Sequence, residues 1–162
     1  MLKWLNNKKK DNKGFSLVEL IIVVAIMAIL VGLLAPQYIK YVEKSRKSAD
    51  ATNMDTLVNA VQIRAADAET DIPAGTYAIQ LNKDAAPTIT EDSNDTNKVF
   101  TAAIAENVAD YQKVTLKSNK WQTGGPKATI VIDSKGNTKV TYDAEDFATF
   151  VAKTKTETKT DK

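Results

Sequence analysis

The chain contains neither cysteine nor histidine, and each absence removes a kind of chemistry. Without cysteine there is no disulfide framework and no thiolate nucleophile. Without histidine the chain lacks the commonest general base near neutral pH and the commonest metal ligand. A phosphate-binding loop and a G-x-S-x-G nucleophile elbow are also missing from the sequence. We therefore expect no enzyme, no cofactor, no metal site and no small-molecule substrate, although scattered acids leave a paired-carboxylate site open.

Positive charge is concentrated at the N-terminus and is nearly balanced elsewhere. Residues 1–14 contain one acidic residue and five of the 22 basic residues. The rest of the chain has 17 basic and 19 acidic residues, a net charge of −2, and this balance gives no case for a nucleic-acid-binding surface. A basic cluster in front of an apolar segment is expected to stay on the cytoplasmic side of a membrane.

A single glutamate stands at the start of a long apolar run. The run from Leu20 to Ile39 has no charged residue and is long enough to span a bilayer, which takes about 20 residues. Glu19 directly precedes it, and an ionisable group in such a segment costs roughly 2.5–3.5 kcal/mol on insertion scales. We expect a cation to meet this carboxylate. Cleavage between Gly14 and Phe15 would create one, because a free α-amino group titrates near pH ~8.

Two simpler interpretations of this segment fit less well. A secretory signal peptide has an apolar core of about 7–15 residues followed by small residues at the cleavage site. Here the apolar run is longer, and Tyr38, Tyr41 and charged residues follow it. An ordinary single-pass anchor fits the length of the run. It does not account for Glu19 or for the Gly-Phe-Ser-Leu junction.

The spacing of apolar residues predicts one helix over residues 15–70. Residues 15–35 are apolar all round, whereas residues after Pro36 have an apolar stripe at three- and four-residue spacing, with most charged residues, including Asp50, expected off it. Such a helix would be about 80 Å long at 1.5 Å per residue. Pro36 lacks an amide proton and Gly32 adds backbone freedom, so we expect a kink or a loosened turn there.

The remainder of the chain predicts a small mixed domain. Strand-like segments are residues 76–81, 113–117, 128–132 and 139–142, and a hairpin turn at 133–137 joins the last two. Residues 82–97 are expected to form a loop. Asp95 or Thr96 is expected to cap a helix that carries Phe100, Ala103, Ile104, Val108 and Tyr111. A short final helix should begin near Asp143 and include Phe147, Phe150 and Val151, followed by a disordered tail at 153–162.

The junction also carries a recognisable motif. Its residues are Phe15-Ser16-Leu17-Val18-Glu19-Leu20-Ile21-Ile22-Val23-Val24-Ala25-Ile26, followed by Pro36-Gln37-Tyr38, Tyr41-Val42 and Ser45-Arg46. This pattern resembles the class III signal of type IV pilins and pseudopilins, which have a short basic leader, the motif G-F-[ST]-L-x-E and an apolar helix. The likeness runs from about Lys8 to Arg46, and residues 47–162 carry no family motif. The family often has glycine at the position of Ala28, whereas here the only glycine in the run is Gly32, one turn later.

The resemblance implies an α+β fold of the pilin type, a "lollipop" with a long N-terminal helix packed on a small antiparallel sheet. The implied parts are a basic leader at 1–14, a transmembrane and polymerisation helix at 15–35, the amphipathic half of the long helix at 36–72, a globular α+β head at 73–152 and the tail at 153–162. Many members of the family close a C-terminal loop with a disulfide, which this chain cannot form.

The resemblance also implies a processing route. A prepilin peptidase would cleave between Gly14 and Phe15 and methylate the Phe15 amine. A membrane platform protein and a cytoplasmic ATPase would assemble the subunit. The precursor would cross the inner membrane once, surrounded by the lipid bilayer and with its head outside, and would then join an extracellular pilus. In the helical homopolymer, Phe15, Glu19, Gly32 and Pro36 are the residues expected to mediate assembly. Glu19 is expected to meet the Phe15 amine of a neighbouring copy, with the Phe15 amine of its own chain, one helical turn away, as the alternative partner.

The implied function is that of a structural subunit of a type IV pilus, which serves adhesion, twitching motility, biofilm formation or DNA uptake. The alternative is a pseudopilin of a type II secretion or competence system, because the N-terminal motif is common to both. A calcium loop near the C-terminus would favour the pseudopilin. Asp143, Glu145 and Asp146 are candidate ligands, but their spacing suits a helix N-terminus equally well.

Overall fold

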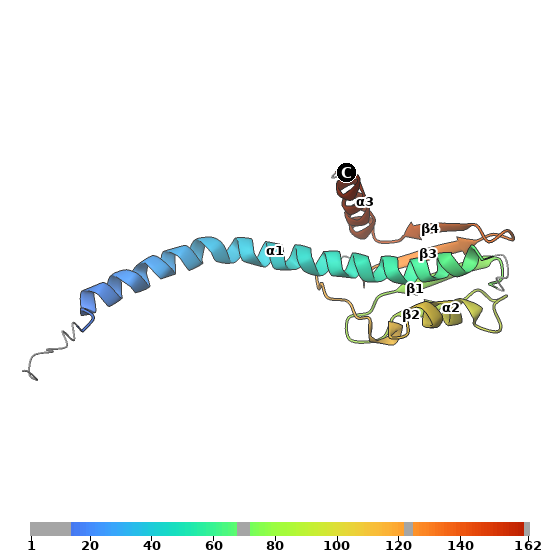
Figure 1. Ribbon diagram of the computed structural model, residues 1–162, viewed down its shortest axis with the longest axis horizontal. Helices are drawn as coiled ribbons and strands as arrows, with labels where there is room; N and C mark the ends of the chain where they lie inside the picture. Colours follow the sequence, from blue (N-terminus) through green and yellow to red (C-terminus); the bar gives the residue numbers. More distant parts are fainter. Residues whose placement is uncertain (1–13, 68–71, 122–124, 161–162) are drawn as a thin grey trace, which may run out of the picture. The chain divides into compact units, whose positions relative to one another are not determined.

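The computed structural model describes residues 14–67, 72–121 and 125–160 (Figure 1). Chain contacts divide it into two units at the boundary between Tyr41 and Val42. Helix α1, Leu17–Ala65, contributes residues to both units. The predicted helix over 15–70 is therefore confirmed with shorter ends, and residues 68–71 lie outside the described part.

In the first unit, α1 is apolar around its whole circumference. The described residues from 14 to 41 are all solvent-exposed. The α-helix continues through Gly32 and Pro36, so the predicted kink does not interrupt it as secondary structure. Whether this turn loosens in an assembled state stays a prediction. Helical structure here follows from the sequence alone, because a continuous run of Leu, Ile, Val and Ala with few breakers suits a helix in lipid.

In the second unit, α1 buries one face. Its buried residues recur at spacings of three and four and are Asp50, Ala51, Met54, Leu57, Val58, Ala60, Val61 and Ala65. The predicted apolar stripe is confirmed at Met54, Leu57, Val58, Val61 and Ala65, whereas Ile39 and Ala49, whose spacing also predicts them on the stripe, are exposed. Asp50 was expected among the charged residues that lie mainly off the stripe. That placement is wrong, because Asp50 lies on the stripe and is fully buried.

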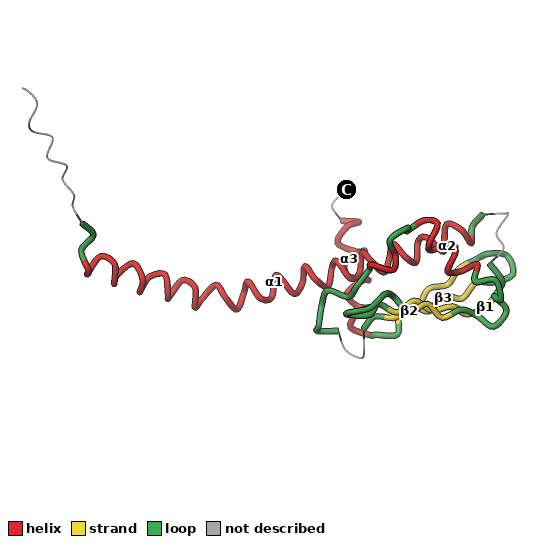
Figure 2. Tube along the Cα trace, turned by 90° about the horizontal axis from the view of Figure 1, so that it is seen from below, coloured by secondary structure: helices red, strands yellow, loops and turns green. Residues whose placement is uncertain are grey.

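A four-stranded antiparallel sheet packs on this face. Strands β1 (Gly75–Gln80), β2 (Thr88–Thr90), β3 (Lys127–Ile132) and β4 (Thr138–Tyr142) lie in the order β2-β1-β3-β4. Tyr77 pairs with Ile130, which pairs with Val140, so alternating side chains of the strands meet on one face. Figure 2 shows the strands as a layer beside α1 and α2. Three of the four strands were predicted from their alternating pattern.

The hairpin between β3 and β4 has the predicted turn. The Asp133 amide donates to the Asn137 carbonyl at 3.0 Å, and the Gly136 amide donates to the Asp133 carbonyl at 3.0 Å. Gly136 has φ +78°, and a Cβ atom there would lie 2.3 Å from the Ala65 carbonyl oxygen at the end of α1. Glycine is therefore required both by the turn and by its close approach to α1.

Two parts of the predicted strand pattern are wrong. Residues 113–117 form no strand: a 3₁₀ turn at Tyr111–Lys113 precedes an irregular segment, where Leu116 donates to Asn82 at 2.8 Å. The alternation there is real, but the backbone is held mainly by a side chain of α1, as described below. Conversely, β2 lies within residues 82–97, which were expected to be a loop. A strand of three residues is too short for alternation to reveal it.

The N-cap residue of helix α2, Val99–Asn107, is Lys98, but the predicted capping residue Asp95 supplies the acceptors for the first amides of the helix. The Asp95 carboxylate accepts from the Val99 and Phe100 amides, each at 2.9 Å. This satisfies amides that have no carbonyl partner in the first turn. Phe100 then stacks on Tyr77 with ring centroids 4.4 Å apart. The helix is shorter than expected, since Val108 and Tyr111 lie beyond its end.

Helix α3, Glu145–Thr160, is longer than predicted. It contains Phe147, Phe150 and Val151 as expected, but its backbone stays helical to Thr160. The expectation of a disordered tail is therefore wrong for residues 153–160. Lysine and glutamate are good helix formers, and extension adds a hydrogen bond per residue once a first turn is fixed by packing. Residues 161–162 of that predicted tail lie outside the described part.

Acidification is expected to weaken the second unit through two turn aspartates. Hydrogen bonds from the Thr76 and Asn94 amides lower the pKa of Asp92, and bonds from Asn137 and the Lys135 amide lower the pKa of Asp133. Because both values lie below the usual 3.8, these groups stabilise the fold above that pH and stop doing so as the pH falls through their folded values. The free energy of unfolding, measured with urea, should be lower at pH 3 than at pH 7. The difference should be smaller in the double variant Asp92→Asn/Asp133→Asn than in the parent. An unchanged pH dependence in that variant would contradict this.

Candidate functional site

The N-terminus of α1 is closed by a reciprocal pair of hydrogen bonds. The Glu19 carboxylate accepts from the Ser16 amide at 2.8 Å, and the Ser16 hydroxyl accepts from the Val18 amide at 3.3 Å. The Glu19 bond is half of a capping box of the type Ser-x-x-Glu, and the Ser16 hydroxyl caps the N2 amide in place of the N3 amide. The spacing of Ser16 and Glu19 in the sequence is the signal from which this pair of bonds could have been predicted. Glu19 therefore has a partner within its own chain in addition to any cation that it meets.

The capping bond leaves the Glu19 carboxylate able to accept further hydrogen bonds. It uses one oxygen, whereas an ionised carboxylate has two oxygens with about four lone-pair sites. Gly14 and Phe15 next to it are exposed, Phe15 with 86% of its surface accessible. A peptidase could thus reach the predicted cleavage site, although residues 1–13 lie outside the described part. The pairing of Glu19 with the amine of Phe15 stays a prediction.

The segment from Phe15 to Ala35 presents an apolar surface with no partner in the described residues. It contains an 18-residue window with a mean hydropathy of 3.1 and none of it buried, and by length and composition the helix could cross a membrane. A Cβ atom built on Gly32 would meet nothing within 4 Å. Ala25, Ala28, Gly32 and Ala35 recur at spacings of three and four, so they share a face where another helix could approach closely.

In the second unit the buried carboxylate of Asp50 binds a distant segment of the chain. One of its oxygens accepts from the Lys117 amide at 2.7 Å. The other accepts from the Ser118 amide at 2.9 Å and from the Trp121 indole N–H at 2.8 Å. We call these four residues the Asp50 clamp. Because three donors converge on it, the charge is buried without an unsatisfied oxygen.

Neighbouring side chains of α1 extend the clamp. Glu43 hydrogen-bonds the Ser118 hydroxyl. The Lys47 ammonium lies 4.0 Å from the centroid of the Trp121 ring and 3.7 Å from the Asp146 carboxylate. Trp121 also meets Phe147 and Phe150 of α3 edge-on. The segment 117–121 and the first turns of α3 are thus attached to α1 in a chain that has no disulfide.

The sequence did contain a signal for the clamp. Asp50 lies four residues before Met54 and seven before Leu57, which is the spacing of the buried stripe. A charged residue at a core position indicates a satisfied buried carboxylate. Its partners could not be found in the same way, because two of the three donors are backbone amides.

Tyr142 provides a polar contact between the sheet and α1. Its hydroxyl donates to the Asp55 carboxylate at 3.2 Å. Burial, followed by the charge of Asp55 and this hydrogen bond, raises the pKa of Tyr142 to about 12. Tyr142 therefore remains a neutral donor at physiological pH.

The acidic residues near the start of α3 do not form a cluster that could hold a metal ion. Asp143 lies 3.2 Å from the Lys127 ammonium, and Asp146 faces Lys47. Among the described residues no group of three acidic side chains has the arrangement of a metal site. The calcium loop considered for a pseudopilin therefore gains no support from this region.

The arrangement defines a class of protein: a helix with an exposed apolar half, whose other half packs on a small antiparallel sheet. Comparisons with known proteins identify the family. A family model described as "Prokaryotic N-terminal methylation motif" matches residues 9–35. The type IV major fimbrial protein FimA of Dichelobacter nodosus is 30% identical over 143 residues, covering 75% of this chain and 86% of FimA. The chain belongs to the type IV pilin family.

A second relative matches over a shorter range. The type IV major pilin protein PilA of Myxococcus xanthus is 45% identical over 49 residues, which is 30% of this chain and 22% of PilA. The chain thus spans about a fifth of the length of that relative. No solved structure matches this chain. Both relatives are pilins, so the comparisons support a structural pilus subunit. They do not favour the pseudopilin alternative.

Proposed function

We propose that this chain is a structural subunit of an extracellular type IV pilus. The observation that carries the proposal is the apolar surface of residues 15–35, which is exposed around the whole helix. Lipid covers such a surface in a membrane-anchored precursor. Outside the membrane only the same segment of other copies has the matching length and apolarity. Burial at about 25 cal/mol per Å² makes bundling of these helices strongly favourable.

Removal of residues 1–14 prepares the chain for this bundle. The leader carries five lysines, which hold it at the cytoplasmic face and would be costly in an apolar core. Cleavage after Gly14 leaves an ammonium on Phe15. The likeness to pilins supports cleavage and methylation by a prepilin peptidase, and extrusion by a membrane platform protein with a cytoplasmic ATPase.

Glu19 then sets the axial position of neighbouring copies. Its capping bond to Ser16 fixes the carboxylate at the start of α1, with lone pairs available for a second donor. The Phe15 ammonium of a neighbouring copy fits that place. A buried charge pair of this kind specifies register, since any axial slip leaves both charges unpaired. Gly32 and the alanines on its face allow close approach, and Pro36 lets the helix adapt.

The pilus serves adhesion, motility, biofilm formation or DNA uptake, and the subunit itself is not an enzyme. The pseudopilin of a secretion or competence system is the second candidate. Electron microscopy of the cell surface separates the two, because a pseudopilus is a short piston within the envelope. Loss of long surface filaments on deletion of this chain supports the pilus, and their persistence contradicts it.

The cleavage site is tested by mass spectrometry of sheared, purified filaments. We expect the N-terminal peptide to begin at methylated Phe15. A Gly14→Ala variant should retain residues 1–14 and enter filaments at least tenfold less, because the leader lysines remain attached. Detection of Met1–Gly14 peptides in filaments of the parent chain would refute the site.

A further inference from the structure

A basic cavity of about 560 Å³ lies on the second unit, apart from the segment that mediates assembly. Three stretches of the chain form its walls. Helix α1 contributes Ser45 and Arg46, the loop after β1 contributes Lys83 and Asp84, and the segment held by the Asp50 clamp contributes Thr115 and Lys117. Three cationic side chains thus face one carboxylate, which makes the cavity suitable for an anion.

The two lysines of the cavity have no carboxylate partner among the described residues, whereas Arg46 is paired with Glu43. No described acidic side chain lies within ion-pair distance of the Lys83 or Lys117 ammonium, and Lys117 donates to the Thr115 hydroxyl at 3.1 Å. Arg46 forms an ion pair with Glu43 at 3.8 Å, a distance that is too long for a good hydrogen bond. Its guanidinium donors are therefore available, and a guanidinium beside ammonium groups is the usual setting for phosphate recognition.

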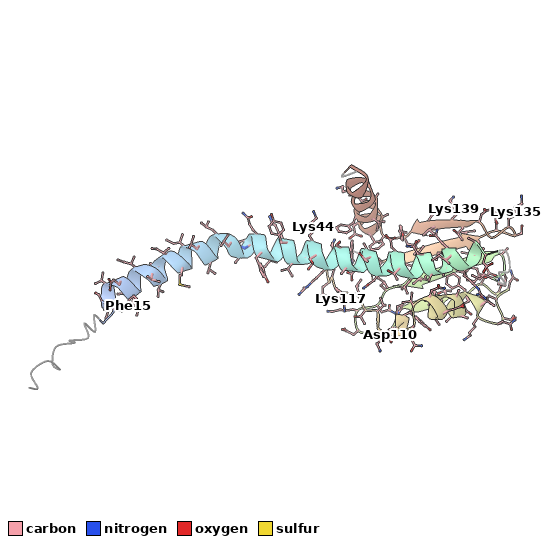
Figure 3. All side chains as sticks on the ribbon, in the orientation of Figure 1. Phe15, Lys44, Asp110, Lys117, Lys135 and Lys139 are labelled. Carbon is pink, nitrogen blue, oxygen red and sulfur yellow. The ribbon has the colours of Figure 1, made fainter. Side chains whose placement is uncertain are left out.

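The walls of the cavity are fixed before any ligand arrives. Asp50 holds the Lys117 and Ser118 amides, and the Leu116 amide donates to the Asn82 carbonyl at 2.8 Å. These bonds join all three stretches, so binding need not first order the segment that carries Lys117. Figure 3 shows Lys117 at one end of the second unit and Lys139 towards the other.

The adjoining surface argues against single-stranded nucleic acid as the ligand. A smaller cavity of about 300 Å³ shares Lys83 with the first and is lined by Trp121. Trp121 has only 8% of its surface exposed, and Phe147, Phe150 and Lys47 pack around its ring. It therefore offers no platform for base stacking, and recognition rests on charge.

We propose that this basic cavity, formed by Arg46, Lys83 and Lys117, binds a phosphate group. The three cations outnumber the Asp84 carboxylate of the lining and the Glu43 carboxylate that pairs with Arg46, and this net positive charge suits inorganic phosphate or the phosphate of an anionic lipid. A free phosphate and a lipid headgroup present the same oxygens, and the membrane-anchored precursor can meet both.

Trp121 provides a built-in reporter, because the chain has only one other tryptophan, Trp4. The full chain carrying Trp4→Phe is purified in a neutral maltoside detergent and titrated with inorganic phosphate at constant ionic strength, with chloride as the control. We expect saturable binding by calorimetry together with a shift in Trp121 emission. The variant Lys83→Gln/Lys117→Gln should lose at least tenfold in affinity, whereas Lys117→Arg should retain it.

The matched control is Lys139→Gln, an exposed lysine away from the cavity, which should bind as the parent does. A second arm places the same chain in vesicles of phosphatidylcholine with or without phosphatidylglycerol. If the emission shift requires phosphatidylglycerol and is lost in the double variant, the cavity binds a lipid headgroup. If only inorganic phosphate gives saturable binding, the cavity binds a free anion. No saturable response in either arm, or equal losses from Lys139→Gln and the double variant, overturns the proposal.

Discussion

Replacement of Asp50 by alanine is expected to lower the unfolding free energy of the second unit by about 3–5 kcal/mol. The substitution leaves the Lys117 and Ser118 amides and the Trp121 indole without their acceptor in a buried site. It also releases the segment that lies between α1 and the aromatic residues of α3. Urea unfolding of the fragment starting at Val42, where the compact second unit begins, measures the loss.

A matched control distinguishes the clamp from a general effect of removing negative charge. Asp110 pairs with Lys113 at 2.8 Å, but both side chains are largely exposed. Asp110→Ala should therefore cost only about 0–1 kcal/mol. Asp50→Asn keeps the size of the side chain but presents an NH₂ group to at least one donor, so it should fall between the two. Equal stabilities of Asp50→Ala and Asp110→Ala would show that the clamp does not hold this fold together.

Substitution of Glu19 is expected to remove at least nine-tenths of the filaments while leaving insertion and cleavage intact. The structure makes a sharper experiment possible than alanine alone, because Glu19 has two separable properties. It caps α1 by accepting from the Ser16 amide, and it carries a negative charge. Glu19→Gln retains an acceptor oxygen for the cap and loses only the charge, whereas Ser16→Ala weakens the cap and retains the charge.

The comparison decides which property assembly requires. If the charge meets the Phe15 ammonium of a neighbouring copy, Glu19→Gln should assemble as poorly as Glu19→Ala, and Ser16→Ala should assemble nearly as well as the parent. The amounts are read from sheared filaments relative to the cleaved subunit in the membrane. Normal filaments from Glu19→Gln would mean that Glu19 serves the helix cap and not an ion pair.

Periodicity predicted the features of this fold that depend on repeating burial. The long helix and three strands have a signal that extends over several residues, whereas the hairpin turn at 133–137 and Asp95 were predicted from turn and capping residue types. Strand β2 has only three residues, and the segment 113–117 alternates without joining the sheet. In both, single contacts between distant residues decide the structure, and such contacts leave no local pattern.

For a similar reason, the sequence predicted the N-terminal part of the candidate site but not the contacts in the second unit. The junction of Gly14, Phe15 and Glu19 is a contiguous motif, so the sequence displays it completely. The Asp50 clamp joins Asp50 to backbone amides 67 and 68 positions away, and any residue type other than proline provides such a donor. The basic cavity depends on the clamp and was likewise not found. At the C-terminus a local pattern was present but did not decide the structure. The polar repeat after residue 152 was interpreted as a disordered tail, because such repeats indicate solubility, but a soluble polar segment can also be helical, as it is here up to Thr160.

The most direct test of the central claim is a helical reconstruction of the assembled filament by electron cryomicroscopy, at a resolution that shows side chains. The account predicts that residues 15–35 of neighbouring copies pack together along the filament axis, with each Glu19 carboxylate within 4 Å of another copy's Phe15 nitrogen, the usual limit for an ion pair. A filament held by contacts between second units alone, with residues 15–35 outside its core or Glu19 bonded only within its own chain, would contradict it.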